Sequence, residues 1–220
     1  MSSNNNPSYV QHHFANKEQQ YESAKLGMWA FLVTEVLTFA GLFCAYAILR
    51  NNFPETFEAC SALLNTNLGL INTIVLITSS LTMALAIYYI QNNNKIRTLQ
   101  MLGVTLVFAA VFMIIKYFEY SHKFHCGHLP GMYYDPHIAP DCISISGQNP
   151  HVFFSIYFMM TGLHGIHVVA GMVLITWLII RTSKGHFNSS YYTPVELVGL
   201  FWHLVDLVWI FLFPLLYLIG

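Results

Sequence analysis

Charged side chains are scarce in this sequence. Of its 220 residues, 9 are Lys or Arg and 10 are Asp or Glu, so 9% are charged, whereas soluble domains carry roughly 25%. So few charges cannot solvate the surface of a water-soluble globule of this length. The net charge of −1 leaves no basic surface for nucleic acid, and a hydrophobic content of 55% excludes a disordered chain. The composition therefore indicates an integral membrane protein.

Motifs of the common enzyme classes are also missing. There is no Gly-x-Ser-x-Gly nucleophile, no His-Glu-x-x-His zinc motif and no glycine-rich phosphate loop. The sequence also lacks the two Glu-x-x-His motifs with which a helical bundle holds a pair of iron ions. We therefore expect no catalytic residue and no metal site in this chain. The alternative that helix geometry still allows is a haem held by His203 and a second histidine.

Five long apolar segments dominate what is present. A helix needs about 20 apolar residues to cross the hydrocarbon core of a membrane, whereas a barrel strand needs only about ten with alternating polarity. The apolar segments cover residues 26–49, 68–90, 99–120, 151–180 and 195–219. They predict an all-α membrane bundle with five transmembrane helices, in which residues 26–220 form one domain after a polar tail at 1–25.

The distribution of Lys and Arg predicts the orientation of these spans, because cytoplasmic loops carry the excess of basic residues. The side that bears the N-terminus has six of them, and the opposite side has Arg50 and Lys123. The six are Lys17, Lys25, Lys95, Arg97, Arg181 and Lys184. We therefore expect a cytoplasmic N-terminus, a periplasmic C-terminus and an external loop at residues 121–150.

Three of the four cysteines fall on the external side in this topology, where oxidising conditions permit disulfides. Cys126 and Cys142 bracket the external loop, and a bridge between them could stabilise it by roughly 3 kcal/mol. The alternative is that Cys60, Cys126 and Cys142 are free thiols. The loop is also rich in histidine, with His122, His125 and His128 beside Cys126, which leaves open either a copper or zinc site or an exposed loop.

Ionisable residues inside the spans are the best candidates for function, because hydrocarbon penalises them. Glu35 lies near the middle of the first span, and we expect it to be neutral or hydrogen-bonded inside the bundle, as a structural carboxyl or as a proton carrier. Lys116 and Glu119, three residues apart near the outer end of the third span, are spaced to form an ion pair.

The last two spans carry further polar residues at helical spacing. The fourth contains Thr161-Gly-Leu-His-Gly-Ile-His167 and then Gly171, whose small residues allow close helix contact. In the fifth, four residues occupy an arc of about 80° around the helix axis: Glu196, Gly199, His203 and Asp206. We expect a polar network of helix-packing residues in which this stripe meets His164 and His167 and to which Glu119 also belongs.

Several strings of this sequence resemble haem-copper oxidase subunit III, the cytochrome c oxidase subunit III family. They are Leu26-Gly-Met-Trp-Ala-Phe-Leu-Val-Thr-Glu-Val36, Glu119-Tyr120, Thr161-Gly-Leu-His-Gly-Ile-His-Val168 with Gly171, and Glu196 followed by Phe201-Trp-His-Leu-Val-Asp-Leu-Val-Trp209. They occur in the family's order and leave out only the N-terminal tail and the second span, where the similarity is generic hydrophobicity. The number of spans resembles the five-helix bacterial form, whereas the mitochondrial form has seven helices.

The resemblance implies a non-redox subunit of a proton-pumping terminal oxidase in the bacterial inner membrane. Haem and copper would belong to partner subunits I and II, and this chain would pack on subunit I, bind phospholipid and support proton uptake. Glu35 matches the family's carbodiimide-reactive carboxyl, and a Glu rather than an Asp at this position resembles the branch that uses cytochrome c. A quinol oxidase subunit III and a stand-alone transporter are the alternatives.

The segment from residue 122 to 150 is longer than the family resemblance leads us to expect. We interpret it as a docking surface for a cytochrome c domain or for another subunit of a larger respiratory supercomplex. The alternative is a loop that only covers the helix ends.

Overall fold

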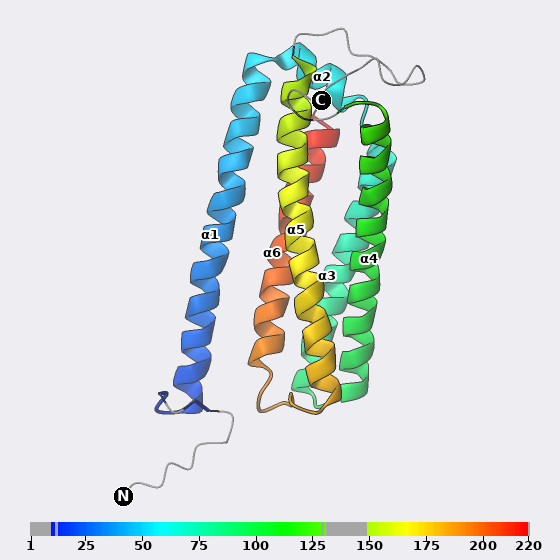
Figure 1. The fold of residues 1–220 in the computed structure, drawn as a ribbon. Helices are drawn as coiled ribbons and strands as arrows, with labels where there is room; N and C mark the ends of the chain where they lie inside the picture. The colour runs from blue at the N-terminus through cyan, green and yellow to red at the C-terminus, as the bar shows by residue number, and fades with distance from the viewer. Residues whose placement is uncertain (1–9, 12, 129, 131–148, 220) are drawn as a thin grey trace, which may run out of the picture.

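The computed structural model describes residues 10–11, 13–128, 130 and 149–219. Its helices are α1 (Lys17–Asn52), α2 (Pro54–Ser61), α3 (Thr66–Gln91), α4 (Lys95–His125), α5 (Pro150–Ser183) and α6 (Thr193–Tyr217). All of them except α2 are long and apolar enough to cross a membrane. The all-α fold with five candidate spans is therefore confirmed. In Figure 1, α1 begins and α6 ends at opposite ends of the bundle, as an odd number of crossings requires.

The helix boundaries differ from the expected spans where the polar sequence can itself form a helix. The side chain of Asn16 accepts a hydrogen bond from the backbone N–H of Gln19, and this cap lets α1 begin at Lys17, inside the expected polar tail. Helix α4 continues beyond its expected span to His125, so the first residues of the expected external loop are helical. The short helix α2 lies in a connection for which no helix was expected.

Two kinds of residue start the helices. Asparagine side chains cap the first turns of α1, α3 and α4. Proline lies in the first turn of α2, α5 and α6, where its missing N–H leaves no hydrogen bond unmade. Both are common signals for the start of a helix, and they determine the residue at which each helix begins.

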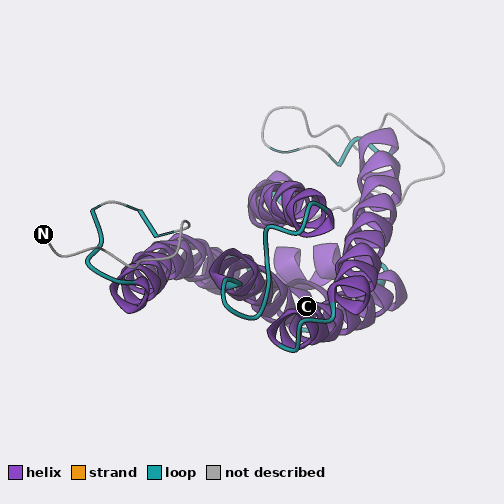
Figure 2. Ribbon diagram, turned by 90° about the horizontal axis from the view of Figure 1, so that it is seen from below, coloured by secondary structure: helices purple, strands orange, loops and turns teal. Residues whose placement is uncertain are grey.

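Helix α6 lies inside the bundle and α1 lies at its edge. In an apolar stretch of 18 residues taken from each helix, 56% of the α6 residues are buried, against 17% of the α1 residues. The indoles of Trp202 and Trp209 on α6 are among the largest fully buried side chains. Figures 1 and 2 both place α1 at one side of the molecule. Most of the surface of α1 is therefore open to lipid or to another protein.

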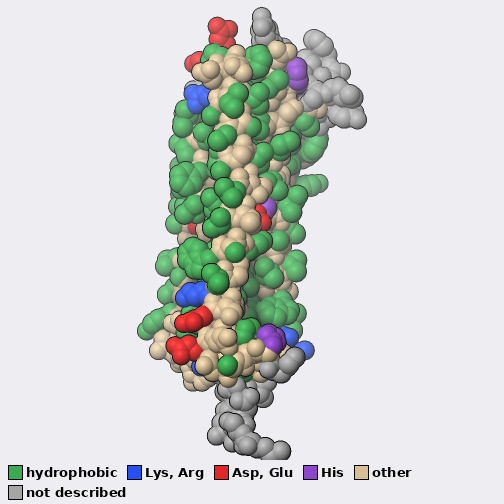
Figure 3. Space-filling view, turned by 90° about the vertical axis from the view of Figure 1, so that its left-hand side faces the viewer, with side chains coloured by type: hydrophobic (Ala, Val, Ile, Leu, Met, Phe, Trp, Pro, Cys, Tyr) green, Lys and Arg blue, Asp and Glu red, His purple; other side chains and the backbone are tan. Residues whose placement is uncertain are grey.

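The lateral surface is apolar. Figure 3 shows hydrophobic side chains over the middle of the face that it presents, with most charged side chains toward the two ends. Leu26, Leu37, Val107 and Ile166 are examples of large side chains that are more than half exposed. Such a surface suits a hydrocarbon solvent, which agrees with the spans that the sequence predicts.

Candidate functional site: polar side chains inside the bundle

Glu35 on α1 and His167 on α5 form an ion pair about halfway along the bundle. The Oε2 atom of Glu35 lies 2.8 Å from Nε2 of His167, and the two side chains are 18% and 16% exposed. The ring of Phe39 packs against the imidazole at a centroid distance of 5.2 Å. The expected intramembrane carboxyl is therefore hydrogen-bonded, and its partner comes from a helix far away in the sequence.

The hydrogen bonds of His167 define the charge of this pair. Its Nδ1 lies 2.8 Å from the carbonyl oxygen of Leu163, which can only accept, so Nδ1 carries a proton. The contact between Nε2 and Glu35 then holds one further proton, on the carboxyl or on the imidazole. In both cases the pair is neutral as a unit, which is the form that a hydrocarbon environment tolerates.

A second buried cluster joins α4, α5 and α6 toward the C-terminal end of α6. Lys116 Nζ donates to Glu119 Oε2 and to the Tyr217 hydroxyl, both at 2.8 Å. The hydroxyls of Tyr157 and Tyr217 donate to the other carboxylate oxygen of Glu119 at 2.9 and 2.5 Å. The ammonium of Lys123 lies 5.0 Å from the ring centroid of Tyr157. Three helices are thus held together through one carboxylate, both of whose oxygens are hydrogen-bonded.

Glu196 joins α6 to α1 near the N-terminal ends of both helices. The Tyr21 hydroxyl donates to its Oε2 at 2.9 Å, and Lys25 Nζ lies 3.1 Å from its Oε1. Lys25 also donates to the Tyr21 hydroxyl at 3.0 Å. The Lys25 side chain is 39% exposed, so this contact lies at the edge of the bundle, where the attraction between the charges is screened.

The remaining polar residues of α6 contact hydroxyl groups of α3. His203 Nδ1 lies 2.6 Å from Ser80 Oγ, and Asp206 lies beside the same serine. Directly beside this contact, the indole N–H of Trp202 donates to Ser79 Oγ at 3.1 Å. These partners were not predicted from the sequence, although the run Thr78-Ser79-Ser80 inside an apolar segment was a usable signal.

His164 has aromatic neighbours instead of polar ones. It is 1% exposed, and its ring packs against Trp209 at a centroid distance of 5.2 Å and against Phe112 at 5.6 Å. Within the described part of the chain, neither ring nitrogen has a hydrogen-bond partner. His164 therefore acts as a large flat core side chain at the junction of α4, α5 and α6.

The single network expected from the sequence is divided among separate contacts. His167 pairs with Glu35, Glu119 with Lys116, Glu196 with Lys25, and His203 and Asp206 lie beside Ser80. The expected meeting of the α6 stripe with the two histidines of α5 was wrong. The physical reason is the interior position of α6, which contacts α1, α3 and α5, so residues within one arc of about 80° reach different neighbours.

The sequence that carries these residues can be compared with the sequences of known proteins. The model of the family described as cytochrome c oxidase subunit III matches residues 7–127 and 139–220. The chain belongs to this family. It is a haem-copper oxidase subunit III, a non-catalytic part of an oxidase complex.

Similar proteins come from both branches of the oxidases. Cytochrome c oxidase subunit 3 of Bacillus subtilis is 31% identical over 89% of this chain and 86% of its own length. Cytochrome bo(3) ubiquinol oxidase subunit 3 of Buchnera aphidicola is 29% identical over 89% of this chain and 91% of its own. The heme-copper oxidase subunit I+III of Aeropyrum pernix is 30% identical over 97% of this chain, which spans 24% of that longer protein.

Members of the subunit III family carry no metal centre of their own. Among the residues that the structure describes, no three His, Cys, Asp or Glu side chains gather to hold an ion. His203, the residue left open as a haem ligand, is hydrogen-bonded to Ser80. The carboxylates of Glu35 and Glu196 contact side chains of a second helix, and that of Glu119 accepts hydrogen bonds from α5 and α6.

The cysteines and histidines of the expected external side differ in their surroundings. Cys126 is disulfide-bonded, so it offers no thiolate to a metal, and its expected partner Cys142 lies outside the described residues. His122 and His125 are exposed, whereas the ring of His128 stacks on Phe154 at a centroid distance of 4.8 Å. Most of the expected loop, residues 131–148, also lies outside the described part of the chain.

Proposed function

We propose that this subunit III supports a proton-pumping, cytochrome c-using oxidase in a bacterial cytoplasmic membrane by packing against catalytic subunit I, with subunit II in the same complex. The observation that carries the proposal is the Glu35–His167 pair. It lies about halfway along α1 and is partly exposed at the lateral surface, on the helix that is least covered by its own chain. Hydrocarbon is a poor solvent for this pair, so a neighbouring protein subunit is the better cover.

The proposed orientation places the N-terminal end of α1 and the α3–α4 connection in the cytoplasm. It rests on the excess of Lys and Arg at that end, because Arg50 and Lys123 are the basic residues of the other end outside the expected spans. In this orientation the segment after α4 lies on the external side, where a cytochrome c domain would approach. Haem and copper would be supplied by the partner subunits.

Three finer assignments follow from the family resemblance. Glu35 stands where quinol oxidases usually have Asp, which favours cytochrome c as the electron donor. The subunit would bind phospholipid between its helices, and it would support proton uptake. Relatives of both donor branches lie at about the same identity, and the experiment below therefore measures turnover with each donor.

The experiment is to purify the oxidase through a tag on the catalytic subunit, from cells with and without this chain. Because the redox centres lie in partner subunits, the haem spectrum and the initial rate with reduced cytochrome c should survive its loss. Without the chain, turnover should decay faster and fewer protons should be pumped per electron. Loss of the haem spectrum, or turnover with quinol but not with cytochrome c, would contradict the proposal.

A further inference from the structure

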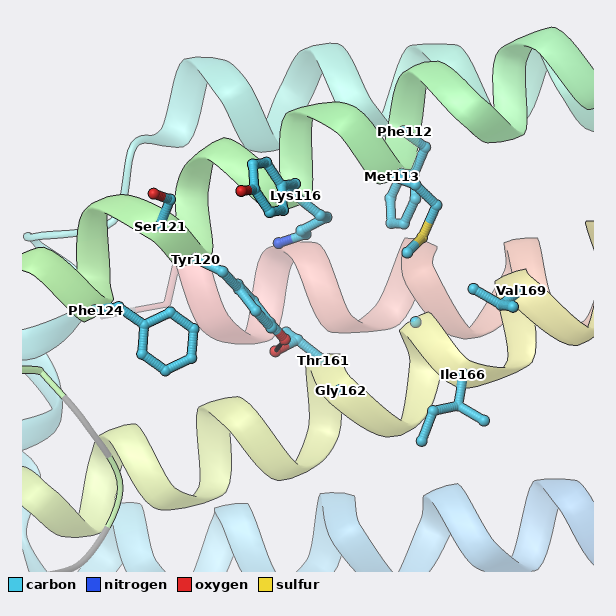
Figure 4. Close-up of a pocket in the computed structure, with 12 residues that line it drawn as sticks. Phe112, Met113, Lys116, Tyr120, Ser121, Phe124, Thr161, Gly162, Ile166 and Val169 are labelled. Atoms are coloured by element: carbon cyan, nitrogen blue, oxygen red, sulfur yellow. Dashed lines mark hydrogen bonds between the residues drawn. The ribbon is translucent and has the colours of Figure 1, made fainter. Parts of the chain in front are cut away.

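A groove runs between α4 and α5 on the lateral face of the bundle (Figure 4). Its volume is about 560 Å³, and its lining side chains come from these two helices alone. Two glycines of α5, Gly162 and Gly165, form part of its wall, and a Cβ atom added to either would meet nothing within 4 Å. Ile166 and Tyr117, which also line it, are 67% and 70% exposed, so the groove opens sideways into the membrane.

The lining of the groove changes in character along its length. Toward the middle of the bundle it is apolar, with Phe112, Met113 and Val169, and the next turn of α4 adds Lys116, whose ammonium is paired with Glu119. Toward the C-terminal end of α4 it carries hydroxyl groups, and there Tyr120 reaches across to Thr161 at an oxygen–oxygen distance of 2.6 Å (Figure 4). In the described part of the chain, the exposed hydroxyl of Ser121 has no protein partner.

The length of the groove corresponds to one leaflet. The α4 residues that line it run from Phe112 to Phe124, a rise of about 18 Å at 1.5 Å per residue. One half of a bilayer core about 30 Å thick is about 15 Å deep. A transmembrane helix of a partner would continue through both leaflets, whereas one lipid chain ends near the bilayer centre.

We propose that this groove holds an acyl chain of a phospholipid from the leaflet that surrounds the C-terminal end of α4. The chain lies along the glycine wall between Phe112 and Ile166, and the ester and phosphate region lies beside the hydroxyls of Tyr117 and Ser121. Apolar contacts hold the tail and hydrogen bonds hold the polar end, so the gradient of the groove matches the gradient of the lipid. This inference rests on the proposed function, because the phospholipid that it places in the groove is the one that the proposed function assigns to the subunit.

The test uses the assembled oxidase in nanodiscs of phosphatidylethanolamine and phosphatidylglycerol, with a trace of phospholipid that carries a diazirine in the middle of an acyl chain. After irradiation, mass spectrometry locates the labelled residues. In the natural sequence, label should concentrate at Phe112, Met113 and residues 162–169. In Gly165→Leu, at a position where a Cβ atom would meet nothing within 4 Å, the added side chain occupies part of the groove, and the label at these positions should fall about tenfold.

Gly103→Leu is the matched control, because Gly103 is also a helical glycine with open space at its Cβ position but does not line the groove. It should leave the labelling unchanged. The inference is overturned if groove residues are labelled no more than the surface around Gly103, if Gly165→Leu changes nothing, or if a partner helix is cross-linked there instead. If subunit III stays in the complex but its groove is not labelled, only the lipid site is refuted. If the groove is labelled but subunit III has no haem-bearing partner, only the proposed function is refuted.

Discussion

Several ionisable side chains inside this bundle are paired with a side chain that can carry the opposite charge. Glu35 with His167 and Lys116 with Glu119 are the clearest cases, because each side chain is at most 18% exposed. A lone charge at this depth would be expensive, and a neutral pair with saturated hydrogen bonds costs much less. Changing one member of a pair should therefore do more harm than changing both.

The Glu35–His167 pair gives the first prediction. In Glu35→Gln the amide can still donate to Nε2 of a neutral His167, so subunit III should remain in the purified complex. In Glu35→Leu the same nitrogen loses its partner, which costs about 1–3 kcal/mol and should reduce retention of the subunit. Quantitative mass spectrometry of the purified complex measures this. Loss of the subunit in Glu35→Gln would show that a carboxyl group, and not merely a hydrogen-bond partner, is required.

The Lys116–Glu119 pair gives the second prediction. Lys116→Met removes the cation that is hydrogen-bonded to a buried carboxylate and should destabilise the subunit by about 3–5 kcal/mol. Adding Glu119→Gln to this variant should recover most of the loss, whereas Arg97→Met, at an exposed position, should have little effect. The temperature at which the complex releases subunit III is the measurement. Additive losses in the double variant would mean that the two side chains do not depend on each other.

The cysteines give the third prediction. Burial raises the pKa of the Cys60 thiol, on α2, to about 12, with the ammonium of Lys123 acting in the opposite direction. The thiolate is the reactive form, so iodoacetamide should modify Cys60 slowly at pH 8 in the native complex and quickly after denaturation. Since an unfolded thiol ionises from about pH 8.5, this group should also lower the stability of the fold as the pH rises toward 12.

The disulfide gives a related prediction on the same side of the bundle. Mass spectrometry without reduction should find the peptides of Cys126 and Cys142 joined to each other. Deletion of the segment between them should lower turnover with the natural electron donor or remove a neighbouring subunit. If the deletion changes neither, the loop does not dock a donor or a subunit.

The sequence predicts the interactions within one helix better than those between helices. Lys116 and Glu119 are three residues apart, and their ion pair follows from helix geometry alone. The partner of Glu35 is 132 residues away, and only the packing of α1 on α5 brings His167 to it. The polar arc of α6 was recognised, but the neighbour that each of its residues meets depends on the arrangement of three other helices.

At the scale of elements, α5 and α6 can pack closely because Gly171 has no side chain. A Cβ atom at Gly171 would lie 2.6 Å from two ring atoms of Trp202, which is closer than real contacts allow. The sequence indicated close packing in this region from its small residues. It did not identify α2, because eight residues with little apolar periodicity give a weak signal, nor the extension of α1 to Lys17, which depends on the cap at Asn16.

Gly171 gives a prediction for this helix contact. Gly171→Ala should force the Trp202 indole or α5 to move and should destabilise the subunit by about 1–3 kcal/mol. Gly103→Ala has open space and should be neutral or stabilising by up to about 1 kcal/mol, because alanine favours the helix. Thermal release of the subunit from the complex compares them. Equal effects of the two substitutions would show that the approach at Gly171 is not tight.

At the scale of the whole molecule, the five spans form a bundle whose lateral surface is apolar and whose first helix is least covered. Composition and run length predicted the class and the number of spans, because both depend only on transfer from water to hydrocarbon. Which part of that surface meets lipid and which meets the catalytic subunit is a property of the assembly. A subunit of this kind is expected to be retained by an oxidase and to hold no haem itself.

Purification of the tagged chain in mild detergent, followed by a haem assay of the product, shows whether this chain is the haem-free subunit of an oxidase. We expect a haem-bearing, dioxygen-reducing partner to be recovered with the chain, and all haem to stay with the partner when the two are separated. Recovery of the chain alone, active as an ion transporter in liposomes and without any oxidase partner, would contradict it.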